Sequence, residues 1–240
     1  MEIPGIHQGS KHRSSQASTN ASTYGSHEEI LIADGPVHIG GHLDLPAHPE
    51  GVVVFAHGSG SSRFSTRNNY VAGVLRDASL GTLLIDLLTP DEDLSRANRF
   101  DIELLTRRLD AAVQWVKGKD GVADLPVGLF GASTGAAAAL RVAAQRPADI
   151  AAVVSRGGRP DMTGQAELGK VQAPTLLIVG GLDGQVIALN QVAADAMQCK
   201  HRIEIVPGAT HLFEEPGTLE QVAGLASRWL VANMAAAPAG

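Results

Sequence analysis

The sequence predicts an α/β fold, with a doubly wound, mostly parallel sheet and helices on both faces. Six short apolar runs predict the central strands, at residues 52–55, 82–85, 127–130, 151–154, 175–179 and 203–206. Most are continuously hydrophobic, which is typical of parallel strands covered on both faces. Longer helical patterns separate them, as in alternating β/α architectures. Upstream, the segments EILIA and VHIGGHLDL suggest an antiparallel opening pair.

Two of the helical patterns are amphipathic, because their apolar residues recur three or four positions apart. They comprise Ile102, Leu105, Leu109, Val113 and Val116 in the middle of the chain, and Leu219, Val222, Leu225 and Trp229 near its C-terminus. In doubly wound sheets, ligands bind outside the carboxyl ends of the strands. We therefore expect the functional residues just after the apolar runs.

The length of 240 residues suits one large domain, which we place at residues 28–235. Residues 1–26 are rich in polar residues and glycine and lack apolar periodicity, so they predict a disordered leader. The formal net charge of −6 argues against nucleic acid as a partner, since phosphate backbones would be repelled. Cys199 is the only cysteine, which rules out an intrachain disulfide. We expect this thiol to be structural or inert.

Hydropathy along the chain argues against a membrane partner. No stretch reaches the ~18 apolar residues that a membrane span requires. The first residues also lack the apolar core of a signal peptide. We therefore expect a cytoplasmic protein. The oligomeric state is not predicted, since no coiled-coil pattern or obvious exposed apolar stripe is present.

Ser133 stands at the corner between a predicted strand and a predicted helix. The segment Gly131-Ala132-Ser133-Thr134-Gly135 fits the pattern G-x-S-x-G, a nucleophile elbow, in the strand–turn–helix context that it requires. The glycines allow backbones to approach closely at the strained turn. A serine capping the helix would be an alternative interpretation. The context favours a nucleophile.

A serine nucleophile needs a base and a group that orients the base, in the chain order Ser, Asp or Glu, His. His211 follows the last predicted strand and is the predicted base, whereas His201 precedes that strand and belongs at the opposite edge. Asp183 follows the strand at 175–179 and is the predicted acid. Asp161, which follows the preceding strand, is the alternative acid.

Two backbone N–H groups are predicted to form the oxyanion hole. The loop FAHGSGSSR at residues 55–63 follows the first central strand, where this fold places one donor. The N–H of Ser59 is the expected donor, with Gly60 as an alternative, and the N–H of Thr134 is the second.

These motifs resemble those of the α/β-hydrolase superfamily, and more closely its small, lidless, dienelactone hydrolase-like branch. The resemblance covers residues 28–235 and rests on HGSGSSR, GLFGASTGAAAAL, LLIVGGLDG and VPGATHLF. Dienelactone hydrolases proper have a cysteine at the elbow, whereas this chain has Ser133. The resemblance therefore implies a general serine esterase that cleaves small or short-chain carboxylic esters through an acyl-enzyme. No metal or organic cofactor is implied, and the expected partner is a small-molecule ester.

Arginines after the strand ends are candidates for the rim of the pocket. Arg63 and Arg156 are the main ones, and they would suit an acyl substrate that bears a carboxylate. The alternative is that the arginines pair with acidic residues in the long loop at 87–100. About twenty residues separate the runs at 151–154 and 175–179, which is too short for a helical lid. We expect an open site.

Three other functions remain as alternatives. A dinucleotide-binding domain would use Gly58-Ser59-Gly60 and Asp86, but its third glycine would fall at Arg63. That interpretation also leaves His211 without a role. A catalytically silent scaffold with this fold would not react at Ser133. An acyltransferase would use the same three side chains and differ only in its acceptor.

Overall fold

The computed structural model describes residues 25–235. Their strands form one eight-stranded sheet in the order β1-β2-β4-β3-β5-β6-β7-β8. Only β2 runs antiparallel to its neighbours β1 and β4, so the predicted opening pair and mostly parallel sheet are confirmed. The strands are β1 (Ser26–Asp34), β2 (Val37–Leu45), β3 (Gly51–Ala56), β4 (Leu80–Ile85), β5 (Val127–Ala132), β6 (Ile150–Arg156), β7 (Thr175–Gly180) and β8 (His201–Val206).

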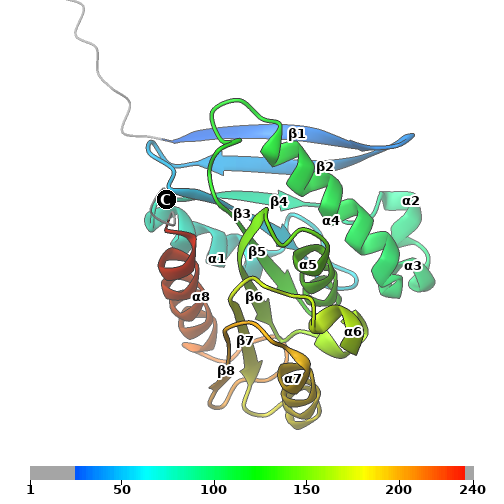
Figure 1. Cartoon of the computed structure of the whole chain (residues 1–240), viewed down its shortest axis with the longest axis vertical. Coiled ribbons are helices and arrows are strands. Elements are labelled where there is room, and N and C mark those ends of the chain that lie inside the picture. The colour runs from blue at the N-terminus through cyan, green and yellow to red at the C-terminus, as the bar shows by residue number, and fades with distance from the viewer. Residues whose placement is uncertain (1–24, 236–240) are drawn as a thin grey trace, which may run out of the picture.

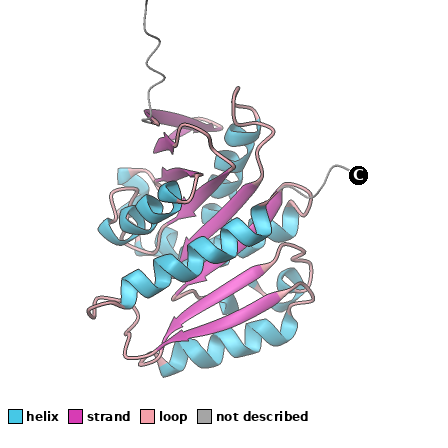
Figure 2. Cartoon of the chain, turned by 90° about the vertical axis from the view of Figure 1, so that its left-hand side faces the viewer, coloured by secondary structure: helices cyan, strands magenta, loops and turns pink. Residues whose placement is uncertain are grey.

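Helices cover both faces of the sheet (Figure 1). One face carries α1 (Thr66–Asp77) and α8 (Thr218–Met234), and the other carries α4 (Ile102–Lys117), α5 (Thr134–Gln145) and α7 (Gly184–Ala196). The side view in Figure 2 shows the strands running between these helices. Both predicted amphipathic helices are present, as α4 and α8.

The sheet separates two apolar clusters, which explains the continuous hydrophobic runs in the sequence. Val54 and Leu129 pack on the α4–α5 side, whereas Phe55 and Phe130 pack on the α1–α8 side. Every residue of β3, β4, β5 and β7 is buried. Apolar side chains on both faces of these strands are removed from water, which supplies the main driving force for this fold.

The loop expected at residues 87–100 contains two short helices that the sequence analysis missed, α2 (Pro90–Asp93) and α3 (Arg96–Phe100). Thr89 begins α2 with a capping box, in which its side chain accepts the N–H of Glu92 and the Glu92 carboxylate accepts the N–H of Thr89. Glu92 also accepts a 2.6 Å hydrogen bond from the buried Arg108 of α4. This pairing fixes the α2–α3 segment beside the carboxyl edge of the sheet.

The connection between β6 and β7 is short, as the sequence predicts. It contains only one turn of 3₁₀ helix, η1 (Pro160–Thr163), and the four-residue α6 (Gln165–Leu168). No large lid is formed by these residues. Among residues 25–235, no helix is both long and apolar enough to cross a bilayer.

The predicted leader, residues 1–26, lies outside the described residues except for its last two. Ser26 already belongs to β1 and pairs with Leu45 of β2. The sheet therefore begins two residues before the predicted start of the domain at residue 28. The added pairing satisfies backbone groups at the end of the β1–β2 ribbon.

Candidate active site

Ser133 lies at the sharp turn between β5 and α5, with φ 50° and ψ −119°. A positive φ is strained for a residue with a side chain and persists only where the surroundings impose it. The two flanking glycines show why. A Cβ on Gly131 would lie 2.4 Å from the Cα of Ala136, and one on Gly135 would lie 2.3 Å from the carbonyl oxygen of Ala56. The G-x-S-x-G pattern thus reflects backbone packing that excludes any side chain at the two glycines.

His211 and Asp183 form a hydrogen-bonded pair across two loops at the carboxyl edge. The Nδ1 atom of His211 lies 2.7 Å from Oδ2 of Asp183. With its Nδ1–H donating to the carboxylate, the ring keeps Nε2 as a proton acceptor. The loop after β8 is held by Glu215, whose carboxylate accepts the N–H and the hydroxyl of Thr210 at 3.0 and 2.6 Å. These hydrogen bonds lower the pKa of Glu215.

The alternative acid Asp161 and the other histidine after Ser133, His201, lie away from this pair. Asp161 is in η1 and binds Arg159 through two hydrogen bonds of 2.9 and 2.8 Å. His201 begins β8 at the amino edge of the sheet, where it is exposed. The carboxylate that binds His211 is that of Asp183, and His211, unlike His201, lines the cavity that contains Ser133. The structure therefore brings together the three residues that the sequence favours.

Ser133 and His211 line one open cavity of about 180 Å³. Its walls come from the loop after β3, the elbow, the end of β6 and the loop after β8; the other lining residues are Gly58, Ser59, Ser61, Ser65, Arg67, Ala132, Arg156 and Leu212. Side chains from distant parts of the sequence meet here because parallel strands end at the same edge. A cavity of this volume suits a small molecule.

The loop after β3 lies directly against the elbow. A Cβ on Gly58 would be 3.0 Å from the Cβ of Ser133. Among the hydrogen bonds formed within residues 25–235, the backbone N–H groups of Ser59 and Thr134 have no acceptor. Both groups are therefore available to a negatively charged oxygen. Gly60, the alternative donor, has a φ of 69° and continues the same loop.

His57 anchors this loop, a role that the sequence analysis did not assign. Its Nδ1 lies 2.9 Å from the carbonyl oxygen of Gly58, and its Nε2 lies 2.9 Å from the N–H of Leu87. A carbonyl only accepts and an N–H only donates, so the ring is neutral with its proton on Nδ1. Burial lowers the pKa of His57, which keeps the ring in this form. The signal in the sequence was a histidine directly before the glycine-rich loop.

Arg156 ends β6 and is only 7% exposed. Its Nη2 donates a 3.3 Å hydrogen bond to Oδ1 of Asn68, while its Nε has no hydrogen-bond partner within residues 25–235. Burial, reinforced by the positive charge of Arg67, lowers the pKa of Arg156 to about 10. Arg67 lines the same cavity and donates a 2.8 Å hydrogen bond to the exposed Glu214.

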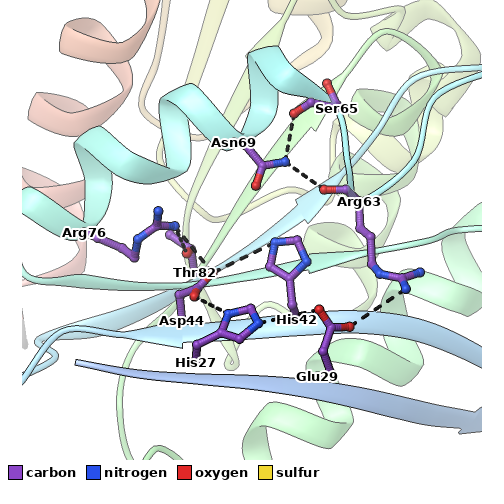
Figure 3. A network of polar contacts seen from close by, with 9 residues as sticks. All are labelled: His27, Glu29, His42, Asp44, Arg63, Ser65, Asn69, Arg76 and Thr82. Carbon is purple, nitrogen blue, oxygen red and sulfur yellow. Dashed lines mark hydrogen bonds and ion pairs between the residues drawn. The ribbon is translucent and has the colours of Figure 1, made fainter. Parts of the chain in front are cut away.

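Arg63, the other predicted rim residue, does not line the cavity. Its backbone N–H and its guanidinium both bind Asp86 at the end of β4, and the guanidinium also lies 3.8 Å from Glu29. Figure 3 shows this side chain directed toward β1, within a polar network that also contains Asp44. Arg63 thus pairs with Asp86 and Glu29, and the alternative pairing with the acidic residues of the loop at 87–100 is wrong for this arginine. Arg63 positions the loop instead of contacting the cavity.

Cys199 lies between α7 and β8 and is half-buried. In the sheet, β8 is three strands away from β5, which precedes the elbow. Its Sγ lies 4.0 Å from Oγ1 of Thr175. Burial raises the pKa of the thiol, which disfavours the reactive thiolate.

A second, much smaller hollow of about 10 Å³ adjoins Ser59 and Thr134, the two expected oxyanion donors. Ser59 and Thr134 contribute to its wall, and Leu87, Leu88 and Leu105 make it largely apolar. This is about the space of one water molecule. Any group that enters it from the site must be small.

A family model described as the dienelactone hydrolase family matches residues 94–235, which contain Ser133, Asp183 and His211. The matched segment is more than half of the chain. This chain belongs to the dienelactone hydrolase family. The hydrolase-family resemblance of its motifs and its α/β-hydrolase fold are thereby confirmed.

Solved structures support the same assignment. A dienelactone hydrolase from Anabaena variabilis is 50% identical and has a TM-score of 0.84, with 88% of this chain and 99% of that chain covered. Est1E from Butyrivibrio proteoclasticus has a TM-score of 0.75 over 87% of this chain and 99% of its own. Its identity of 15% shows a shared fold alone.

The curated relatives of this family member are longer. "Putative phosphoribosyl transferase Rv0571c" of Mycobacterium tuberculosis is 58% identical over 207 residues, which are 86% of this chain and 46% of that protein. The same values hold for the corresponding protein of a second strain. The chain therefore spans about half the length of the curated relatives it matches.

Proposed function

We propose that this protein is a serine hydrolase that cleaves carboxylic esters of small or short-chain acyl groups through an acyl-enzyme. One observation carries the proposal: the strained Ser133 shares its cavity with His211, which is itself hydrogen-bonded to Asp183. Backbone strain of this kind is typical of active sites and ligand-binding sites. The arrangement is that of a nucleophile, a base and a group that orients the base.

In the proposed reaction, His211 takes the proton of the Ser133 hydroxyl as the serine oxygen attacks the ester carbonyl. Asp183 holds the imidazole in the required tautomer and stabilises its positive charge. The N–H groups of Ser59 and Thr134 stabilise the oxyanion. His211 then gives this proton to the alcohol oxygen as the ester bond breaks. In the second half, His211 deprotonates a water molecule that attacks the acyl carbon, and it returns the proton to the Ser133 oxygen as the acid leaves.

The size of the site supports small acyl groups. The hollow beside the oxyanion donors is about 10 Å³, so an acetyl methyl group suits it better than a long chain. The larger cavity of about 180 Å³ would receive the alcohol part of the ester. A long acyl chain would have to displace buried leucine side chains.

The name of the curated relatives suggests phosphoribosyl transfer as a different activity. That name belongs to proteins of which this chain matches 46%. Within this chain, the family match names a hydrolase family and contains all three proposed catalytic residues. We therefore propose ester hydrolysis for this chain.

The test is hydrolysis of p-nitrophenyl esters from acetate to laurate by the wild type, Ser133→Ala and Ser227→Ala. Removing the nucleophile should lower kcat on the order of 10⁴-fold or more. Ser227→Ala is the matched control, because Ser227 lies in α8 and does not line the cavity. Equal activity in the wild type and Ser133→Ala would disprove the nucleophile.

Two further measurements separate the alternatives. A fluorophosphonate probe should label the wild type at Ser133, whereas a catalytically silent scaffold would stay unlabelled. Product analysis with added alcohols or amines distinguishes water from another acyl acceptor. A predominance of acyl transfer over hydrolysis would replace the hydrolase by an acyltransferase with the same three residues.

A further inference from the structure

Arg156 is a buried cation that has no counter-ion among the described residues. The ion pairs formed within residues 25–235 include none to this guanidinium, whose hydrogen-bond partner is the neutral Asn68. A buried charge is normally paired, because removal from water disfavours the charged form. The depressed pKa of about 10 agrees, since both of its causes oppose the charge and no acidic neighbour supports it. An anion would supply the missing partner.

Arg156 lines the same cavity as Ser133, so an anion that reaches it would belong to a molecule in the active site. The peptide groups of the two residues are themselves joined, because the N–H of Ser133 donates to the carbonyl oxygen of Arg156 at 3.3 Å. A charged group bound here would therefore be close to the bond that the enzyme cleaves.

A second cation faces the cavity from α1. Arg67 lies in the first turn of this 12-residue helix, and its Nε is also buried without a hydrogen-bond partner in the part of the chain that the structure describes. Its Nη1 is bound to Glu214, which is exposed and lies on the loop that carries His211. An incoming anion would compete with Glu214 for Arg67.

Several neutral donors lie on the same wall. The N-terminus of α1 carries a partial positive charge and is a favourable position for phosphate. Ser61 and Ser65 also line the cavity. Ser65 uses its oxygen to accept the N–H of Asn68, which leaves its hydroxyl hydrogen to donate.

We propose that this wall is a phosphate subsite, and that the substrates of the enzyme are small esters that also carry a phosphate monoester group. The proposal rests on the proposed esterase function and names its substrate class. Two guanidinium groups and two hydroxyl groups line this one cavity, and the N-terminus of α1 adjoins it. A phosphate, with its charge near −2 and three acceptor oxygens, satisfies more of them than a planar carboxylate does. The phosphate stays on the substrate; only the ester bond is cleaved.

Binding can be measured without esterase activity. Ser133→Ala is titrated with phenyl phosphate by calorimetry, with benzoate and benzyl alcohol as the carboxylate and neutral probes. We expect phenyl phosphate to bind about 10-fold more tightly than benzoate, and benzyl alcohol to bind most weakly. Arg156→Gln and Arg67→Gln, each added to Ser133→Ala, should weaken phenyl phosphate binding about 10-fold, since each removes a charged hydrogen bond.

Matched variants control for charge and folding. Arg202→Gln removes the same charge from the exposed amino end of β8 and should leave binding unchanged. Glu214→Gln should tighten phenyl phosphate binding several-fold, because it releases Arg67. If Arg156→Gln does not fold, the subsite is still tested by Arg67→Gln, which should weaken phenyl phosphate binding, and by Glu214→Gln, which should tighten it.

Benzoate binding as tight as phenyl phosphate would overturn the phosphate assignment. Binding that is unchanged in Arg67→Gln and Glu214→Gln would overturn the subsite itself. Neither outcome depends on catalysis, so a failed esterase assay of the wild type would count against the proposed function and not against the phosphate subsite.

Discussion

The imidazole of His57 joins two loops at the carboxyl edge of the sheet, because its Nε2 accepts the backbone N–H of Leu87 at 2.9 Å. The other ring nitrogen binds the carbonyl of Gly58, the residue before the proposed oxyanion donor Ser59. One neutral ring thus connects the loop after β3 with the segment after β4. Protonation would place a hydrogen on Nε2 opposite the Leu87 N–H and break this connection.

Stability should therefore depend on pH through His57. Its folded-state pKa is lowered, mainly by burial, from an ordinary value of 6.5, despite the opposing influence of Asp86 and Asp93. Below about pH 6.5 the unfolded chain binds a proton that the folded chain refuses, so this contribution to stability is present above pH 6.5 and is lost as the pH falls. His57→Gln lacks this contribution.

The measurement is the free energy of unfolding of the wild type and His57→Gln between pH 8 and pH 5. The wild type should be more stable at pH 8, and the difference should shrink toward pH 5. Subtracting the variant removes the effect of other histidines, such as the buried His42, whose pKa burial also lowers. A constant difference across this range would show that His57 is not held neutral by the fold.

Asp183 is predicted to be essential for activity, whereas Asp161 is not. Asp183→Asn should lower kcat on the order of 10⁴-fold with little change in KM, because an amide favours the wrong tautomer of His211. Asp161→Asn is the matched control, since its carboxylate binds Arg159. It should change activity by about twofold at most. The measurement is kcat and KM for p-nitrophenyl acetate hydrolysis by both variants. A larger loss of kcat in Asp161→Asn than in Asp183→Asn would show that Asp161 is the acid.

Much of this site could be predicted from the sequence, because its chemistry follows strand ends. The elbow needs glycines around Ser133, and the chain order leaves few partners, so the positions of Asp183 and His211 followed from the order of apolar runs. Their pairing at 2.7 Å agrees with that prediction.

The directions in which side chains point could not be predicted from the sequence. Arg63 and Arg156 both follow apolar runs in the sequence, yet Arg63 binds Asp86 while Arg156 lines the cavity. That difference depends on the tertiary arrangement of α1 and the β1–β2 ribbon. The helices α2 and α3 were missed for a related reason, since four- and five-residue helices carry too little periodicity to be recognised.

The elbow glycines provide a prediction about stability. Gly131→Ala should destabilise the protein by about 3 kcal/mol or more, because its Cβ would lie 2.4 Å from the backbone of Ala136. For a domain of this size, that corresponds to a fall in Tm of about 6–12 °C. Gly184→Ala, at the start of α7, is the control: its Cβ would meet nothing within 4 Å. Alanine there should keep or slightly raise the Tm. Equal losses in both variants would contradict the packing argument.

The hollow beside Thr134 predicts how acyl-chain selectivity can be changed. Leu88 lines it and is 7% exposed, so Leu88→Ala should enlarge it without exposing much new surface. A pocket that gains or loses one or two methylenes changes discrimination by about 10-fold or more. The ratio of kcat/KM for p-nitrophenyl butyrate over acetate should therefore rise about 10-fold.

Leu94→Ala is the control, because Leu94 lies on the neighbouring α2–α3 segment but is 84% exposed. Its selectivity ratio should match that of the wild type. Leu88→Ala is expected to lower stability by about 2–5 kcal/mol, so Leu88→Val serves as a milder variant whose ratio should shift in the same direction. If both Leu88 variants kept the wild-type ratio while remaining folded, the acyl group would occupy the larger cavity beside Arg156. The alcohol part would then have to point out of the site, which would reverse the proposed orientation of the substrate.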